Sequence, residues 1–512
     1  MKKYASILAV LVLLLGFVAS AYSAPAEIPS DTTAVIAKGK TQITLGGELR
    51  FRGMYGSNLS ATDKDTGYES TKSPNTSYYD YRVMLNMEAK VSPNTTGFVE
   101  LQSGTFNTDN VNWGSATGSS EAQSGAQSGA RGVYTSGNTK DSNVTIRQAW
   151  IQYQGSGLLG VPAGIKVGRQ LLKLGNGLFF DHTYFGDEAI VAFVQPVKEL
   201  TIAGLTAKFR EGSTTLSDDA DAYVLLGAYQ GKGFGISADI TYVDDQGNKN
   251  ATSAYYANSS SSTVTGGFAN ALGYGTEADT HLWNFGLRGN VDDIAGTGLG
   301  FRADVEFQTG KIVNVTSGLK EPKFKGWAAL AGLDYKFKTI PLGLTLEYAI
   351  GSGIEGSGTN GKFDPANDDI KGFITALGQE QHYTFVYEYL APSACVIRTT
   401  TGSNIQFNRA GLCNTQYVKL GGAYDITKDL KGELYGYWLR AVKDVAINDS
   451  TNTYKDKDLG WEVDAKVTYQ IDKGLKYWVE GGYFWPGDAY KLSSGKDADD
   501  AWAVRHGIQL NF

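Results

Sequence analysis

The chain has 512 residues, and 64 of them are glycine, a share well above the usual 7% or so. Hydrophobic residues make up 42% of the chain and aromatic residues 12%, which is ample for a folded core and excludes general disorder. The formal net charge of −7 excludes the basic footprint of a nucleic-acid-binding protein. A helical transporter needs several apolar runs of about 20 residues, whereas this sequence has a single such run at its N-terminus.

That N-terminal run has the three-part layout of a secretory signal peptide. Two lysines precede the apolar stretch Ile7 to Val18, and small residues follow at Ala24 and Ala26. We therefore expect residues 1–26 to be a signal peptide that is cleaved after Ala26. Removal of two of the 46 basic residues leaves a mature net charge of 44 − 53 = −9.

Strict alternation of apolar and polar residues marks the first strand after this segment. From Gln42 onward, one face carries Ile43, Leu45, Leu49 and Phe51, and the other carries Thr44, Glu48, Arg50 and Arg52. A period of two residues cannot form one face of a helix, so it predicts a β-strand. Residues 27–41 then form a short N-terminal segment, which we expect to lie in the periplasm and which is too short for a plug domain.

The same alternation recurs along the rest of the chain and predicts an all-β protein. Segments of about 10 residues with an apolar and a polar face are typical of transmembrane barrel strands. The further strands are expected near 79–91, 97–104, 144–153, 164–171, 189–196, 201–210, 221–230, 233–243, 281–291, 299–308, 325–337, 342–350, 416–426, 430–440, 459–471, 475–485 and 502–512. The prediction is an antiparallel up-and-down β-barrel over residues 42–512 with about 18 strands, within a range of 16 to 20.

The connections between these strands alternate in length. Short turns such as Ser92 to Asn94 read as periplasmic, whereas the stretches 56–78, 106–142, 244–279 and 352–415 read as extracellular loops. A soluble sandwich or propeller has no reason to place every long loop on one side. The asymmetry therefore orients the barrel in an outer membrane.

The segment His382 to Leu390 complicates the strand count, because it also alternates. It is either a hairpin arm within the long loop 352–415, or it pairs with 404–409 to make 20 strands. With 18 strands, Cys395 and Cys413 share one extracellular loop and can form a disulfide across 17 residues, worth about 3 kcal/mol. A secreted chain with two cysteines favours that bond, so we prefer 18 strands.

The polar faces of the strands carry many charged side chains, which are costly in lipid and therefore predict a water-filled lumen. Lys208 is among the bases that the alternation places on the inward face. The pore-lining candidates are Glu48, Arg50, Arg52, Arg82, Arg288, Arg302, Asp304 and Glu306.

The stretch 172–188 is a candidate constriction loop. It carries Asp181, Asp187 and Glu188 beside the aromatic pair Phe179-Phe180. Acidic side chains on an inward-folded loop, opposite wall arginines such as Arg50, Arg52 and Arg82, would create a transverse field that sorts solutes by charge. The alternative is an ordinary exposed loop.

Other chemistry has little support in the sequence. Catalysis at a barrel rim needs a histidine with a serine or aspartate partner, but His281 and His506 fall on outward phases, and His182 and His382 lie in expected loops without a recognisable motif. We therefore expect no enzyme, no cofactor and no metal site. Solvated loop charge is the simplest reading of the acidic loop clusters.

The signal peptide, the alternating strands, the Gly168-Arg169-Gln170 strand end with its glycine-containing loop, and Phe512 closing an alternating strand together resemble a Gram-negative outer-membrane porin. The chain is similar to the alginate-export and phosphate-selective porin types and to porins of metal-reducing bacteria. The resemblance implies passive diffusion of small hydrophilic solutes and ions, often as a homotrimer, in contact with outer-membrane lipids and lipopolysaccharide. The alternatives are a substrate-specific channel for a sugar or organic acid, and a barrel sheath for a cytochrome electron conduit.

Overall fold

The structure is a computed structural model that describes residues 36–38, 41–59, 75–103, 111–112, 144–157, 160–183, 186–211, 218–246, 268–376, 383–387, 394–398, 400, 404–406, 411–449, 451 and 453–512. The expected signal peptide, residues 1–26, lies outside the described residues, as does most of the expected N-terminal segment 27–41. His382 also lies outside them.

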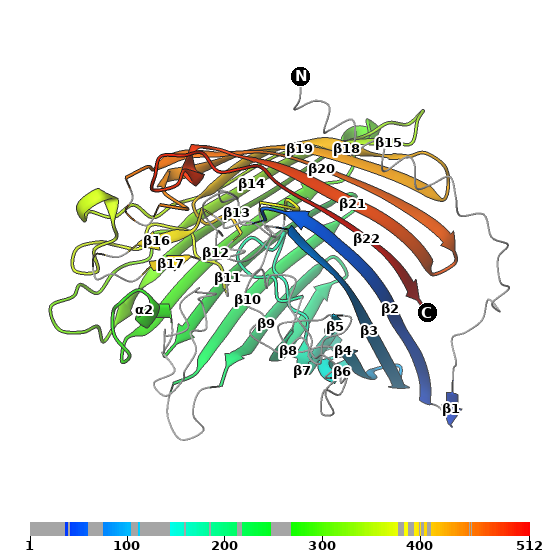
Figure 1. Ribbon diagram of the computed structural model, residues 1–512. Coiled ribbons are helices and arrows are strands. Elements are labelled where there is room, and N and C mark those ends of the chain that lie inside the picture. The colour runs from blue at the N-terminus through cyan, green and yellow to red at the C-terminus, as the bar shows by residue number, and fades with distance from the viewer. Residues whose placement is uncertain are drawn as a thin grey trace, which may run out of the picture.

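Within the described residues, eighteen long strands form one closed antiparallel barrel (Figure 1). The first nine are β2 (Thr41–Ser57), β3 (Asn75–Ser92), β4 (Thr95–Ser103), β6 (Val144–Gly155), β7 (Ala163–Gln170), β8 (Asp187–Val197), β9 (Leu200–Arg210), β10 (Ala220–Gly231) and β11 (Phe234–Asp245). The second nine are β12 (Asp279–Val291), β13 (Leu299–Val313), β14 (Trp327–Lys336), β15 (Leu342–Gly351), β18 (Thr415–Asp425), β19 (Leu430–Val445), β20 (Asp456–Asp472), β21 (Leu475–Pro486) and β22 (Ala501–Asn511). The predicted all-β barrel of 18 strands is confirmed.

Shorter elements accompany the barrel. β1 (Ile36–Lys38) pairs with the start of β2, and β5 (Val111–Asn112) pairs with β3. β16 (Val396–Arg398) and β17 (Asn404–Gln406) form a separate hairpin between β15 and β18. The described helical elements are α2 (Phe268–Ala271) and the 3₁₀ turns Ile294–Gly296, Thr359–Gly361 and Asp488–Tyr490. In the described part of the chain, no helix combines the length and the apolar character needed to cross a bilayer.

The barrel is closed by its last and first long strands. β22 pairs antiparallel with β2 from Glu48 opposite Asn511 to Ser57 opposite Trp502. Two further backbone hydrogen bonds join Gly47 and Phe512 at the end of this seam, with N···O distances of 2.9 and 3.2 Å. Every strand edge of the barrel therefore has a partner, as a sheet in lipid requires.

The two faces of the barrel differ in polarity, as the alternation predicts. Outward side chains such as Leu85, Ile151 and Leu420 are apolar and exposed, whereas inward side chains such as Asp304 and Glu306 are charged and buried. A soluble protein has the opposite arrangement. The outer surface therefore suits lipid, and the inner surface suits water and ion pairs.

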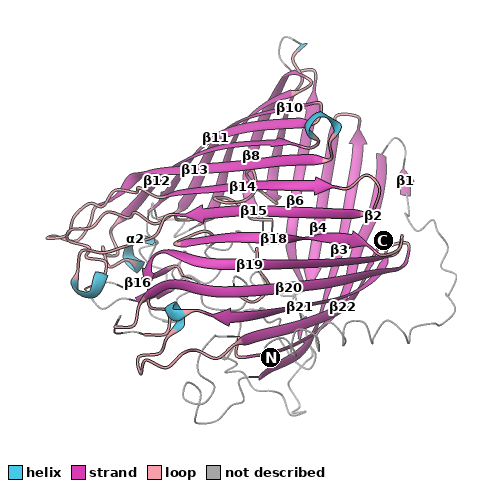
Figure 2. Cartoon of the chain, turned by 90° about the horizontal axis from the view of Figure 1, so that it is seen from above, coloured by secondary structure: helices cyan, strands magenta, loops and turns pink. Residues whose placement is uncertain are grey.

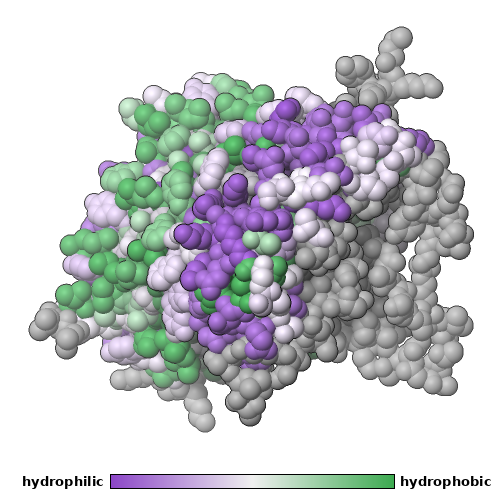
Figure 3. Space-filling model, turned by 90° about the vertical axis from the view of Figure 1, so that its left-hand side faces the viewer, coloured by the Kyte–Doolittle hydropathy of each residue, from purple (hydrophilic) through white to green (hydrophobic). Residues whose placement is uncertain are grey.

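The two ends of the barrel also differ. Short turns gather at the end where the C-terminus lies, and long connections with α2 and β16 gather at the other end (Figure 2). Seen from the long-loop end, hydrophilic side chains spread across the middle of the molecule and apolar ones along one flank (Figure 3). The short and long connections therefore lie at opposite ends of the barrel, as their alternation along the chain predicts.

Two details differ from expectation. The described part of the alternating segment, residues 383–387, forms a turn inside the barrel and does not pair as a strand. Lys208 lies on the outer face, because β9 turns Ile202 and the other even-numbered residues up to Lys208 outward and buried Ala203 and Ala207 inward, the reverse of the expected phase. A bulge between Lys208 and Arg210 then returns Arg210 to the inner face, where it pairs with buried Asp245.

Candidate functional site

The inward charges of β21, β22, β2 and β3 form what we call the basic wall. Arg52 makes a bidentate ion pair with Asp80, with N···O distances of 2.9 and 2.8 Å. Arg82 lies 2.6 Å from Glu48. The inward bases of these four strands are Arg50, Arg52, Arg82, Lys90, Lys476 and Arg505, and the inward acids are Glu48, Asp80, Glu88 and Glu480, which gives a formal charge of 6 − 4 = +2.

The opposite side of the barrel, from β11 to β15, forms the acidic wall. Arg288 is surrounded by Asp239, Asp304 and Glu306, with 2.5 Å to Glu306 and 3.3 Å to Asp304. The inward acids here are Asp239, Asp245, Asp304, Glu306, Asp334 and Glu347, and the inward bases are Arg288, Arg302 and Lys336, which gives 3 − 6 = −3. In the cyclic strand order, β12 is the ninth strand from β2 in either direction, so the two walls face each other.

A second arginine joins neighbouring strands of the acidic wall. Arg302 of β13 pairs with Asp334 of β14 and lies 2.5 Å from Glu347 of β15. Tyr417 of β18 donates its hydroxyl to Glu347 at 2.7 Å. The pore-lining candidates of both walls therefore face the lumen, and most of them are held in ion pairs between strands.

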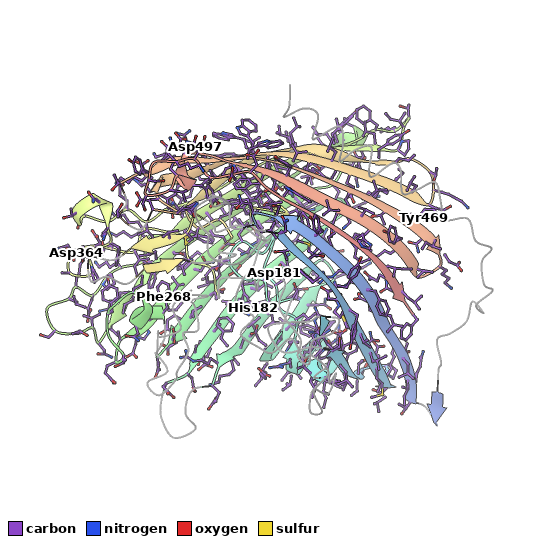
Figure 4. The ribbon with its side chains drawn as sticks, viewed as in Figure 1. Asp181, His182, Phe268, Asp364, Tyr469 and Asp497 are labelled. Atoms are coloured by element: carbon purple, nitrogen blue, oxygen red, sulfur yellow. A yellow bond between two sulfur atoms is a disulfide. The ribbon has the colours of Figure 1, made fainter. Side chains whose placement is uncertain are left out.

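The third loop, residues 171–186 between β7 and β8, folds into the barrel. Its tip reaches the acidic wall, where Asn176 donates its backbone N–H and its side-chain amide to Asp304, at 3.0 and 3.2 Å. Gly175 has a φ of +53° and lies against Arg288, where a side chain would collide. Phe179 and Phe180 are fully buried. Figure 4 shows Asp181 and His182 of this loop inside the barrel.

The acidic residues predicted for the constriction do not act as a set. Asp181 pairs with Lys173 of the same loop at 2.6 Å, and Asp187, the first residue of β8, lies 2.7 Å from buried His182. Glu188 takes the outward phase of β8 and pairs with Arg169 at 2.7 Å. The acids that oppose the basic wall are therefore those of β11–β15, which the alternation had placed inward but the constriction hypothesis had not used.

Steric crowding requires a glycine at position 168, near the end of β7. Gly168 has a φ of +123°, and a side chain there would run into the backbone of Ala149 on β6. β7 then ends at Gln170, whose amide donates to the backbone oxygen of Ala189 at 3.1 Å. These contacts fix the point from which the third loop turns inward.

The seventh loop, residues 352–414 between β15 and β18, also enters the lumen. Gln308 of β13 accepts a hydrogen bond from the backbone of Ile374 and donates one to it, at 3.0 and 2.6 Å. Ala376 donates its backbone N–H to Phe179 of the third loop at 2.8 Å. The two loops therefore meet inside the barrel and narrow it together.

One disulfide and two ion pairs hold the outer part of the seventh loop. Cys395 and Cys413 are joined by a disulfide with a Cα–Cα distance of 5.3 Å. Asp369 lies 2.8 Å from Lys320 and 2.7 Å from Lys325 of the neighbouring loop. Burial of Asp369 by itself raises the pKa of its carboxyl, but the hydrogen bonds from both lysines outweigh this effect and lower that pKa.

Alternation places Glu462 and Asp464 on the inward face, but sequence reasoning missed their contact with the seventh loop. Glu462 and Asp464 of β20 accept hydrogen bonds from backbone N–H groups of the seventh loop. Their cross-strand neighbours are Tyr437 and Phe484 for Glu462, and Tyr435 and Gly482 for Asp464. Neither acid has a base directly opposite it on a neighbouring strand, and this was the available signal that some other donor must reach them.

A cavity of 650 Å³ lies on the short-turn side of the third-loop tip. Asn176 of the tip borders it, and its wall includes Arg288, Arg302, Asp334 and Tyr435. It is lined by hydrogen-bonding side chains of both charges, which suits water and small polar solutes. The described residues contain no group of three or more histidine, cysteine or carboxylate side chains arranged to hold a metal ion.

Comparison with known proteins supports this architecture. Residues 234–504, just over half of the chain, match the family model for alginate export. The solved structure of OccAB3 from Acinetobacter baumannii is 12% identical, with a TM-score of 0.50 over 91% of this chain and 99% of that one. OpdQ from Pseudomonas aeruginosa is 9% identical, with a TM-score of 0.48 over 92% of this chain and 97% of that one. No curated protein matches the sequence.

Proposed function

This chain belongs to the alginate export family of β-barrels in the Gram-negative outer membrane, and from that premise we propose that it forms a water-filled channel for passive diffusion of small hydrophilic solutes and ions. The observation that carries the proposal is the lumen itself. An eighteen-strand barrel is wide enough to hold water. Its inner face carries ion pairs, such as those of Arg52 and of Arg302, that would be costly in a dry interior.

A second candidate is a substrate-specific channel for a sugar or an organic acid. The observation that favours it is the meeting of the third and seventh loops at Phe179 and Ala376, because two inward loops leave a narrower path than a general pore needs. Walls of +2 and −3 on opposite sides would also orient a dipolar solute as it passes.

The cytochrome sheath has less support. The third loop reaches the acidic wall at Asp304, and the seventh loop reaches β20 at Glu462. A protein conductor filling the lumen would have to displace both loops and break these hydrogen bonds. Copurification of haem with the folded protein would reopen this alternative.

Planar-bilayer recording of the purified, folded protein tests the channel. We expect stepwise conductance, and conductance steps that persist in the presence of sugars and carboxylates support general diffusion. Concentration-dependent block by one solute class, for example glucose or succinate, supports the specific channel. Folded protein without any conductance steps would overturn both forms of the proposal.

Three further assignments belong to this proposal. The signal peptide is tested by N-terminal sequencing of the exported protein, which should begin at Glu27. The homotrimer is tested by native mass spectrometry in detergent. Contact with outer-membrane lipids and lipopolysaccharide is inferred from the apolar outer face, and lipopolysaccharide that survives purification would support it.

A further inference from the structure

Residues 383–387 of the seventh loop are packed against the inner face of the barrel. Tyr383 stacks on Tyr417 of β18, with ring centroids 4.2 Å apart. Val386 and Tyr387 are fully buried, and the Tyr387 hydroxyl is 3.1 Å from the hydroxyl of Thr415. This segment thus occupies space through which a solute would otherwise pass.

Backbone hydrogen bonds to Glu462 hold this segment in place. Glu462 accepts the N–H groups of Phe385 and Val386 on one oxygen, at 2.9 and 2.5 Å, and the N–H of Tyr387 on the other, at 2.8 Å. Asp464 accepts a second bond from the Phe385 N–H at 3.0 Å. Because both oxygens of Glu462 are used, the contact needs a carboxylate.

The surroundings explain why the loop supplies these donors. Glu462 is completely buried, and its neighbours across the sheet are Tyr437 and Phe484. A buried carboxylate is costly unless hydrogen bonds or a cation compensate it. Three successive N–H groups provide that compensation, so the acid and the loop segment stabilise each other.

We propose that Glu462 is the positioning residue that holds residues 383–387 inside the lumen and thereby sets the bore of the channel. The inference rests on the proposed channel function, because the bore is the width of the path that solutes take through the lumen. Loss of the Glu462 carboxylate frees the segment and widens the path.

Asp464 has a different part in the contact. It accepts only the Phe385 N–H, which Glu462 also accepts, whereas Glu462 accepts three N–H groups on its two oxygens. The other oxygen of Asp464, Oδ1, is buried without a hydrogen-bond partner. An amide at position 464 keeps an oxygen for the Phe385 N–H, whereas an amide at 462 loses one acceptor oxygen and turns an NH₂ toward an N–H donor.

Acid pH acts on the same contact. When a proton binds Glu462, one of its oxygens stops accepting and the segment is released. The other charged and titratable groups around this site, strand by strand, are Glu347 of β15, Lys419 of β18, Tyr435 and Tyr437 of β19, Asp464 and Lys466 of β20, Glu480 of β21 and Arg505 of β22, which lies over the Phe385 ring. The segment itself adds Tyr383 and Tyr387.

Hydrogen exchange tests the anchor without reference to conduction. In Glu462→Gln, the backbone amides of residues 385–387 should exchange at least about tenfold faster than in the wild type. Asp464→Asn should leave the exchange close to wild type. Glu433→Gln is the matched control, because it removes an inward carboxylate that pairs with Lys431 and lies on β19. Unchanged exchange in Glu462→Gln would overturn the proposal.

Single-channel recording then tests the effect on bore. Glu462→Gln should raise the step conductance, and wild type should approach that value as the pH is lowered, with Glu433→Gln and Asp464→Asn following the wild type. Faster exchange with the wild-type conductance at every pH would refute the role in bore. Conductance steps in wild type with no change in Glu462→Gln would refute it as well, while leaving the channel function standing.

Discussion

The two walls of the barrel use their charges differently. On the basic wall, arginines pair with acids of adjacent strands, as Arg52 does with Asp80. On the acidic wall, carboxylates outnumber bases, and Asp304 accepts donors from the third loop. Buried carboxylates that outnumber the bases need hydrogen bonds from N–H groups, and an inward loop provides these hydrogen bonds. Surplus carboxylates on a barrel wall thus mark the places where loops attach.

The largest expected effect comes from removing the cation at the centre of the acidic wall. Arg288→Gln leaves Asp239, Asp304 and Glu306 without their shared cation. We expect a loss of about 3–5 kcal/mol in the free energy of unfolding, measured by urea titration in detergent. Arg52→Gln on the basic wall leaves only one acid, Asp80, without its cation, so the loss in the free energy of unfolding should be smaller. Equal losses in the two variants would break the comparison between the walls.

The next effect separates loop attachment from stability. Asp304→Asn weakens the charged acceptor of the Asn176 N–H and amide, so the third-loop tip should lose about 1–3 kcal/mol of local stability. Hydrogen exchange of residues 174–180 measures this loss. Asp80→Asn also disturbs a buried ion pair, yet those amides should keep their protection. Faster exchange in both variants would mean that the loop responds to general loosening of the barrel.

A smaller effect is expected where the seventh loop leaves the barrel. The pKa of Asp369 lies below its usual value, because the bonds from Lys320 and Lys325 outweigh the opposite effect of burial. The contact is therefore complete above the ordinary carboxyl pKa, near 4, and is lost as pH falls below it toward the folded pKa. These lysines are partly exposed, so the contribution is about 1 kcal/mol.

Exchange of residues 364–376 at pH 7 and pH 3 checks this contact. Asp369→Asn should exchange faster than wild type at pH 7, and the difference should become smaller at pH 3, after correction for the intrinsic rate. A difference of the same size at both pH values would show that the contact does not depend on the charge of Asp369.

The smallest effect concerns ion selectivity. Arg50→Gln lowers the positive charge of the basic wall, and Asp334→Asn lowers the negative charge of the acidic wall. The anion-to-cation permeability ratio should fall by about twofold in the first variant and rise by about twofold in the second, since screened charges in a wet lumen act weakly. Reversal potentials in a salt gradient measure the ratio. Shifts of the same sign would contradict opposite wall charges.

Most of the barrel could be predicted from the sequence, because alternation along a strand is a local signal. The strands from Thr41–Ser57 to Ala501–Asn511 follow the expected order. Lys208 is an exception, because β9 carries apolar residues on both faces, such as Ile202 outside and Ala207 inside, so that alternation alone does not reveal its phase. The choice of 18 strands over 20 rests on Cys395 and Cys413, because only 18 strands place both cysteines in one loop, where they form a disulfide.

The inward loops could be predicted only in part. The third loop was a candidate for constriction, but its acids are satisfied locally, with Asp181 on Lys173 and Asp187 on His182. Which wall a loop reaches depends on contacts between residues such as Asn176 and Asp304, 128 positions apart in the chain. No periodicity within either segment encodes such a pairing.

The seam between β2 and β22 sets the order in which the protein can be assembled. Each of the other strand pairs within the barrel joins neighbours along the chain, but Gln509 bonds to Glu48 across 461 positions. Closing so long a loop has a large entropic cost and makes the contact late in folding. Until it forms, β2 and β22 are both open edges with unpaired N–H and C=O groups in lipid. The half-built sheet is thus the species most in need of an insertion machinery that shields its edges.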